Sequence, residues 1–181
     1  MRALLFILSG VIGLFVVACS PIRVLETETD EGFKLSNYKT FDFYDVDASG
    51  DALKPYEAQL QFLQQQITQQ LEQRGLQRSS ASPDLKVNLG IVVAEQVQTR
   101  ETNILTDPPF YVGQRRYTWK TREVEVGRYQ QGTLSVHLVD NARSELVWQG
   151  AAQGVVPEEN TAKLQKRIAE GVRKLVQEIP Q

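Results

Sequence analysis

Residues 85–93 read LKVNLGIVV, with an apolar side chain at every second position. This period of two is typical of a strand that buries one of its faces. The pattern runs through residues 84–98 and places five side chains on the apolar face, namely Leu85, Val87, Leu89, Ile91 and Val93. We therefore predict a long, half-buried strand at the centre of a sheet.

A hairpin is predicted further along the chain. Residues 133–139 alternate in the same way, residues 140–144 read DNARS, and residues 146–150 resume the alternation. Asp, Asn and Ser are the residues that favour tight turns, so the two runs should pair as antiparallel strands. Just before them, the apolar residues of a further predicted strand change from odd positions, Tyr117 and Trp119, to even positions, Val124 and Val126. This change of alternation indicates a β-bulge.

Two helices are predicted on either side of these strands. Residues 55–74 carry one apolar stripe, and residues 158–178 carry another. Both stripes repeat every three or four residues, which is the spacing of an amphipathic helix. The first stripe comprises Tyr56, Leu60, Leu63, Ile67 and Leu71, and the second comprises Leu164, Ile168, Val172, Leu175 and Ile179.

Residues 22–29 and 38–43 are rich in β-forming residues and complete the set of predicted strands. The order of strands and helices predicts the α+β class, as a two-layer sandwich with two helices packed on one face of a mainly antiparallel sheet. No repeat and no Gly/Ser-rich or Pro-rich linker divides residues 22–181, which we expect to form a single domain.

The first 18 residues have the pattern of a lipoprotein leader. Arg2 supplies a positive charge, residues 3–17 are apolar, and Ala18 is the small residue expected at a cleavage site. Cys19, the only cysteine of the chain, follows directly. We therefore expect a signal peptide over residues 1–18, lipidation of Cys19, and a short tether over residues 19–21. The mature chain would be attached to the membrane through acyl chains on Cys19.

The net charge of the expected mature chain argues against one class of partner, nucleic acid. The whole chain has 20 Lys and Arg against 22 Asp and Glu, and the leader removes only Arg2, which leaves a net charge of −3. A nucleic-acid-binding domain would normally be basic, so nucleic acid is not expected as a partner.

Several short segments resemble one family of bacterial lipoproteins, the domain-of-unknown-function family DUF4136. They are YKTF at residues 38–41, LEQRGL at 71–76, PDLKV at 83–87, GTLSVHLVD at 132–140 and LVWQGA at 146–151. The resemblance implies an envelope location and no known reaction. In lipoproteins of this kind a residue such as Ser20 after the cysteine permits export to the outer membrane, so we expect the domain to face the periplasm.

A possible calcium loop lies at residues 45–51, where oxygen-bearing side chains alternate before a sharp turn. The candidate ligands are Asp45, Asp47, Ser49 and Asp51. The twelfth position of such a loop should be a glutamate but is Tyr56, so an ordinary turn between a strand and a helix is the preferred interpretation.

No credible catalytic constellation is found in the sequence. His137 is the only histidine, and a hydrolase would have to build its general base from it. It falls opposite an apolar strand face, where a cross-strand contact explains it. One histidine and one lipidated cysteine cannot supply a zinc site. We therefore expect a protein that is not an enzyme and that carries no cofactor and no metal.

Two surfaces remain as candidate binding sites. Apolar residues surround Pro108 and Pro109 in a loop that should be polar; they are Ile104, Leu105, Phe110, Tyr111 and Val112. They suggest contact with an envelope partner or with the membrane, and the alternative is that they fold back over the edge of the sheet. Arginines and aromatic residues follow, and could hold a small ligand or a glycan; they are Arg115, Tyr117, Trp119 and Arg122. The leading hypothesis is a lipid-anchored docking protein, and the alternative is a periplasmic module that binds a small ligand or a glycan.

Overall fold

A computed structural model describes residues 22–44, 57–103, 105–107, 120–157 and 161–181. The predicted leader, the lipidation site Cys19 with its cleavage residue Ala18, and the candidate calcium ligands lie outside these residues.

One sheet of seven strands forms the framework of the domain. Its strand order is β1-β7-β6-β5-β3-β4, and β2 also pairs with β7. The bounds of the strands are β1 Ile22–Val24, β2 Glu28–Thr29, β3 Thr40–Phe43, β4 Gln77–Arg78, β5 Leu85–Glu101, β6 Glu123–Asp140 and β7 Glu145–Val156. The long strand expected at residues 84–98 corresponds to β5, which lies inside the sheet, between β6 and β3.

The sheet is mixed. β3 runs parallel to both β4 and β5, whereas β1, β2, β5, β6 and β7 form antiparallel pairs. The parallel pairs follow from the helix α2 (Glu57–Gln73), which connects β3 to β4 and β5, because parallel neighbours need a long crossover connection. The α+β class is confirmed. The sheet contains parallel as well as antiparallel pairs, whereas a mainly antiparallel sheet was expected.

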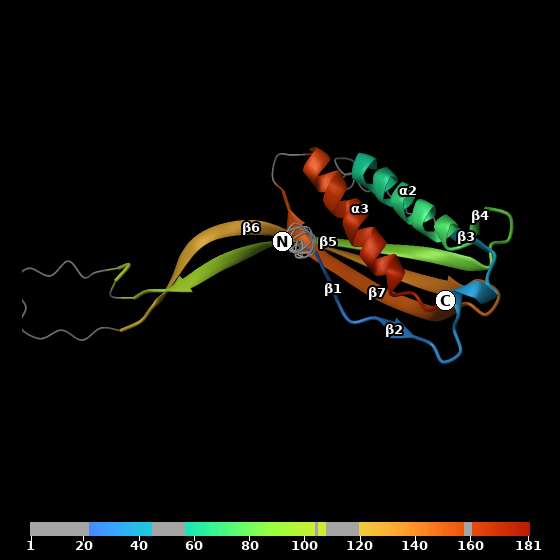
Figure 1. Ribbon diagram of the computed structural model, residues 1–181, viewed down its shortest axis with the longest axis horizontal. Coiled ribbons are helices and arrows are strands. Elements are labelled where there is room, and N and C mark those ends of the chain that lie inside the picture. Colours follow the sequence, from blue (N-terminus) through green and yellow to red (C-terminus); the bar gives the residue numbers. More distant parts are fainter. Residues whose placement is uncertain (1–21, 45–56, 104, 108–119, 158–160) are drawn as a thin grey trace, which may run out of the picture.

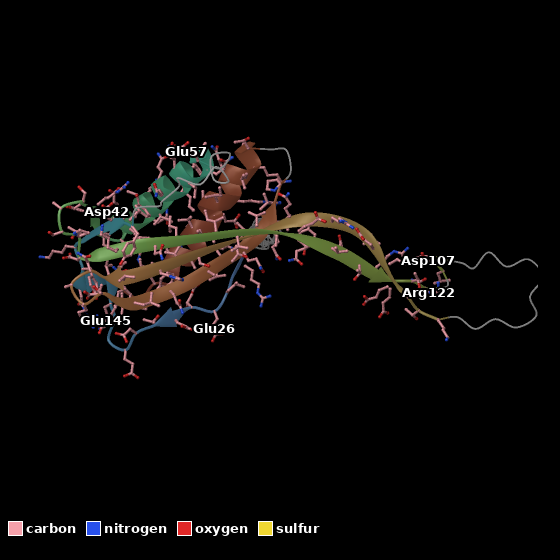
Figure 2. The ribbon with its side chains drawn as sticks, turned by 180° about the vertical axis from the view of Figure 1, so that it is seen from behind. Glu26, Asp42, Glu57, Asp107, Arg122 and Glu145 are labelled. Atoms are coloured by element: carbon pink, nitrogen blue, oxygen red, sulfur yellow. The ribbon has the colours of Figure 1, made fainter. Side chains whose placement is uncertain are left out.

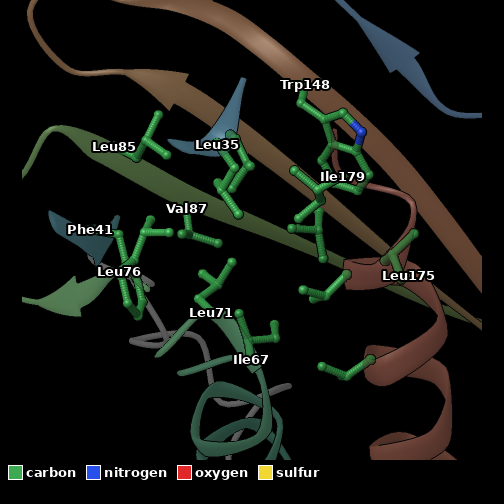
Figure 3. Packing of buried hydrophobic residues seen from close by; sticks show 14 of the residues in the cluster. Leu35, Phe41, Ile67, Leu71, Leu76, Leu85, Val87, Trp148, Leu175 and Ile179 are labelled. Atoms are coloured by element: carbon green, nitrogen blue, oxygen red, sulfur yellow. The ribbon is translucent and has the colours of Figure 1, made fainter. Parts of the chain in front are cut away.

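The helices α2 and α3 (Thr161–Gln177) lie side by side over one face of the curved sheet (Figure 1). Their predicted stripes supply most of the buried residues of this layer, namely Leu63, Ile67 and Leu71 in α2 and Val172 and Leu175 in α3, and α3 also buries Gly171 and Val176. Leu85 and Val87 of β5 meet these helices from the sheet (Figure 3). A short 3₁₀ helix, η2 (Leu35–Asn37), adds the buried Leu35 to the same core.

The predicted hairpin is formed by β6 and β7, which are joined by a turn at residues 141–144. Trp148 of β7 is buried in the core with 1% of its surface exposed. A Cβ atom at Gly150 would lie 2.8 Å from Cη2 of Trp148 and 2.9 Å from Cγ2 of Thr27. The indole ring therefore occupies the space that a side chain at position 150 would need.

Two carboxylates, one just before β5 and one at the end of β6, join the N-terminal segment to the long strands. Asp84 Oδ2 accepts hydrogen bonds from the backbone N–H groups of Lys39 and Thr40, at 2.8 and 2.9 Å. Asp140, which is buried, accepts one from the hydroxyl of Tyr38 at 3.0 Å. These residues fall in the segments YKTF, PDLKV and GTLSVHLVD that carry the family resemblance, so those segments have structural roles here.

Arg74 attaches the end of α2 to the segment after α3. Its guanidinium donates to the backbone carbonyls of Val176 and Ile179, the second at 2.7 Å. Burial lowers the pKa of Arg74, yet the carbonyl oxygens hold the charged group in place. The two helices are thereby joined at the same end.

Replacing Arg74 with alanine should lower the free energy of unfolding by about 1.5–3 kcal/mol, the usual contribution of hydrogen bonds to a charged group. Urea unfolding of the variant and of wild type would measure the difference. Arg23→Ala, at an exposed position of β1, is the control and should change the stability by no more than about 0.5 kcal/mol. Equal effects of the two substitutions would contradict this role of Arg74.

Candidate interaction arm

The strands β5 and β6 continue well beyond the rest of the domain. β3 pairs with β5 only as far as Val87, and β7 pairs with β6 only from Gln130 onward. Residues 91–101 of β5 and their partners 123–134 of β6 belong to a segment that projects from the domain (Figure 1), which we call the arm. β7 still pairs with β6 at the base of the arm, and the arm is a two-stranded ribbon beyond Gln130.

The lengths of the elements explain why the arm is uncovered. A helix of 17 residues is about 26 Å long, because each residue rises about 1.5 Å. A strand of 17 residues spans about 56 Å at about 3.3 Å per residue. Since α2, α3 and β5 each contain 17 residues, the helices cover less than half of β5.

The arm exposes aliphatic side chains. Ile91 and Val93 share a face of β5 with the buried Leu85 and Val87, as predicted, but each has 48% of its surface exposed. Their expected burial was wrong because the helices among the described residues leave this part of β5 exposed. The other exposed aliphatic residues of the arm are Val92, Val97 and Val126.

Charged residues are placed between the aliphatic ones. Arg128 forms ion pairs with Glu95 at 2.9 Å and with Glu125 at 2.6 Å. The hydrogen bonds that Arg128 donates to these carboxylates raise the pKa of its guanidinium. Val126 is the extra residue of a β-bulge, because Gln98 pairs with Gly127 and Thr99 pairs with Glu125. The arm thus combines a bulge, compensated charges and exposed aliphatic side chains.

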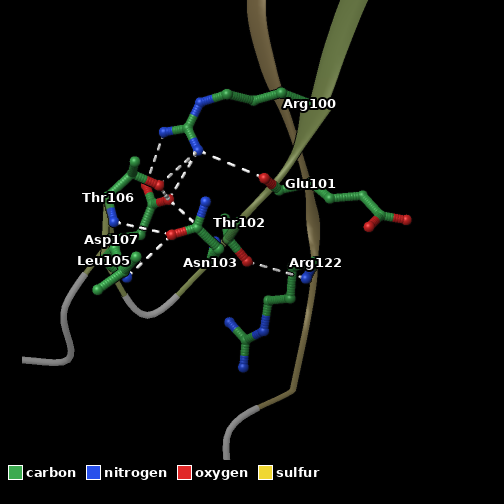
Figure 4. A network of polar contacts seen from close by, with 8 residues as sticks. All are labelled: Arg100, Glu101, Thr102, Asn103, Leu105, Thr106, Asp107 and Arg122. Atoms are coloured by element: carbon green, nitrogen blue, oxygen red, sulfur yellow. Dashed lines mark hydrogen bonds and ion pairs between the residues drawn. The ribbon is translucent and has the colours of Figure 1, made fainter.

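Polar contacts hold the described tip of the arm together (Figure 4). Both carboxylate oxygens of Asp107 accept hydrogen bonds from the guanidinium of Arg100, each at 2.7 Å. These bonds hold the pKa of Asp107 far below its usual range. The amide N–H of Thr102 donates to the carbonyl of Arg122 at 2.8 Å, and the N–H of Arg122 donates to the hydroxyl of Thr102 at 3.0 Å.

Replacing Asp107 with asparagine should loosen the tip without unfolding the domain. The pair with Arg100 is exposed to solvent, so the global stability should change by less than about 1 kcal/mol. Amide hydrogen exchange of Asp107, whose N–H donates to the carbonyl of Asn103, should become faster, because the tip no longer has its bidentate contact. Exchange at Val87, in the core, should stay the same. Unchanged exchange at the tip would contradict this role of the ion pair.

Few of the residues proposed as binding sites from the sequence are described. Leu105 lies at the tip with 89% of its surface exposed, and Arg122 is exposed beside it. Figure 2 shows Asp107 and Arg122 together at the far end of the arm, opposite the end that carries Glu145. The others lie outside the described residues, namely Ile104, Phe110, Tyr111, Val112, Arg115, Tyr117 and Trp119.

His137 lies within β6, where Asn88 of β5 and Gln149 of β7 are its partners in register. Its neighbours Val136 and Leu138 are buried beneath the helices, so His137 is on the opposite face of the sheet. Among the described residues, no group of three or more His, Cys, Asp or Glu side chains could hold a metal ion. Within the same residues, no helix has the length and apolar character required to span a bilayer.

These observations define an α+β domain that carries a projecting two-stranded arm. The chain belongs to the family described as "Domain of unknown function (DUF4136)", whose model matches residues 25–181. No curated protein matches the chain.

One solved structure shares the fold at low sequence identity. A PDZ domain protein from Parabacteroides distasonis ATCC 8503 superposes with a TM-score of 0.51 at 13% identity, over 93% of this chain and 38% of that protein. The chain therefore spans less than half the length of that relative. Two structures of the PelC dodecamer from Paraburkholderia phytofirmans give TM-scores of 0.42 and 0.45 at 8% and 9% identity. They match over 84% and 88% of this chain and 92% and 99% of theirs.

Proposed function

We propose that this chain is a lipid-anchored lipoprotein of the bacterial envelope that docks to another envelope component through its arm and performs no catalysis. The anchor is Cys19, and the domain faces the periplasm from the outer membrane. Residues 22–181 act as one two-layer domain, in which the helices shield one face of the sheet and support the base of the arm.

The projecting arm is the observation that supports this function best. It extends from a domain whose core is already complete, and it contributes little to that core because Ile91, Val93 and Val97 are about half exposed. Exposed aliphatic side chains beyond a closed core are typical of contact surfaces. Attachment through Cys19 would keep the arm at a high effective concentration near its target, so a modest contact surface is sufficient.

Crosslinking in intact cells tests this function. A photoreactive amino acid would replace Val97 in the full-length chain, and a second version would replace Glu145 at the opposite end of the domain. Position 97 should give a crosslink to an envelope component, and position 145 should not. The same crosslink should be lost in a Cys19→Ala background, because the domain would no longer be held at the membrane.

Two results would contradict the proposal. Equal crosslinking from positions 97 and 145 would show that the arm has no special role. An unchanged crosslink in the Cys19→Ala variant would show that anchoring is not required.

A further inference from the structure

The start of β1 and the base of the arm lie in one cross-strand row. Ile22 pairs with Gly154 of β7, Gly154 pairs with Gly132 of β6, and Gly132 pairs with Val93 of β5. Four neighbouring strands span about 14 Å, because adjacent strands are about 4.8 Å apart. The point where the tether joins the domain is therefore close to the exposed Val93.

The direction of β1 places its first residue, Ile22, on the side of the arm. β7 runs from Glu145 toward the arm and ends at Val156, and β1 is antiparallel to it. Ile22 is therefore the residue of β1 that lies nearest the arm. Ile22 itself is fixed in the domain, because its side chain is buried and Lys174 donates a hydrogen bond to its carbonyl.

The relative lengths of tether and arm limit how the domain can sit on a membrane. Residues 19–21 span at most about 11 Å even when fully extended, at about 3.6 Å per residue. The arm beyond Val93 contains residues 93–101 of β5, or about 30 Å of strand. When the domain is anchored, the membrane therefore lies on the side of the arm. The distance from Ile22 to the membrane is then much shorter than the arm.

We infer that the arm lies along the lipid surface, with the exposed aliphatic side chains around Val93 and Val97 in the interface of the bilayer. This inference rests on the proposed anchoring at Cys19, and it identifies the envelope component that the arm contacts as the lipid itself. Burial of a few aliphatic side chains gives weak binding alone, which becomes effective when acyl chains hold the domain in place.

The charges of the arm are compatible with this position. Arg128 forms ion pairs with both Glu95 and Glu125, so it offsets one of these two negative charges and lowers their repulsion from the anionic phospholipid. Long side chains such as that of Arg128 can also keep their charged ends at the level of the headgroups while the strand lies below them.

The test uses the full-length lipidated protein in vesicles of phosphatidylethanolamine and phosphatidylglycerol. Single cysteines introduced as Val93→Cys, Val97→Cys and Glu145→Cys would each carry an environment-sensitive fluorophore, since the acylated sulfur of Cys19 cannot react with it. Flotation with the vesicles would report anchoring separately. The labels at positions 93 and 97 should emit at shorter wavelength, be quenched by nitroxide-labelled lipid and be protected from iodide, whereas the label at position 145 should behave as in water.

Three other results would overturn the inference. Labels at 93 and 97 that remain accessible to iodide on floating vesicles would show that the arm projects into water, although anchoring would stand. Protection from iodide without quenching by the lipid nitroxide would indicate contact with protein, such as a second copy of the chain. A chain that does not float would refute the anchoring proposal, and the inference would fail with it.

Discussion

Replacing Trp148 with alanine should lower the free energy of unfolding by about 3–5 kcal/mol, the range observed when a large aromatic side chain is removed from a core. Trp148 is almost fully buried, and its ring occupies the space beside Gly150. Trp148→Phe should cost less, because the indole Nε1 has no hydrogen-bond partner among the described residues. Urea unfolding followed by circular dichroism would measure both changes.

A double-mutant cycle would show whether the ring and Gly150 depend on each other. Gly150→Ala should destabilise the wild-type domain by about 1–3 kcal/mol, because the new methyl group overlaps the ring. In the Trp148→Ala background the same change should cost less, since the ring is gone and Cγ2 of Thr27 is the remaining close neighbour. Gly90→Ala is the matched control: its Cβ would lie 3.5 Å from Cβ of Ser135, an ordinary contact, and its effect should stay within about 0.5 kcal/mol. Strictly additive effects of Gly150→Ala and Trp148→Ala would refute the proposed contact.

Replacing Asp140 with alanine should destabilise the domain by about 3 kcal/mol, because hydrogen bonds to a charged group contribute about 1.5–3 kcal/mol. The carboxylate accepts bonds from the backbone N–H groups of Ala142 and Arg143, from the Arg143 side chain and from the Tyr38 hydroxyl. The loss of these bonds would release the N-terminal segment from the hairpin. Glu26→Gln, at an exposed position, should have almost no effect.

The same contacts predict how stability depends on pH. The backbone N–H of Arg143 is the largest influence that holds the pKa of Asp140 below its usual value, and the N–H of Lys39 acts in the same way on Asp84. A carboxyl whose pKa is lower in the folded state stabilises the fold above its unfolded pKa, about 3.9. That contribution is lost as the pH falls through the folded pKa. Unfolding free energies measured at a series of pH values should therefore decrease below about pH 5. The decrease should be smaller in Asp140→Asn, and an identical pH profile would contradict this role of the carboxylate.

The periodicity of the sequence predicted most of the elements. The alternation that begins at Leu85 gave the central strand β5, and the two helical stripes became α2 and α3. These patterns were reliable because a strand or helix with one buried face must repeat its apolar residues at the period of its backbone.

The parallel pairing of β3 was missed, although the sequence contained a signal for it. A strand at 40–43, a helix and then further strands form the order in which crossover connections and parallel neighbours arise. The short strand β4 (Gln77–Arg78) has no periodicity of its own, because two residues are too few to show one.

The arm was missed for a different physical reason. Alternation shows which residues lie on the same face of a strand, but it does not show whether another element covers that face. Ile91 and Val93 continue the pattern of Leu85, and only a comparison of strand and helix lengths separates the covered part from the exposed part. The role of Asp140 could not be predicted either. An aspartate in a turn has the same sequence pattern whether or not Tyr38, distant in sequence, donates a hydrogen bond to it.

The pairing of the long strands has a practical consequence for purified protein. From Ile91 to Glu101, β5 pairs only with β6 among the described strands, so one side of its backbone is open to another strand. A strand with an open side favours self-association and aggregation. Charged side chains along the strand oppose both. A lipid-free form of the chain should therefore become more prone to aggregate when Glu95 and Arg128 are both replaced by valine, and light scattering during concentration would reveal it.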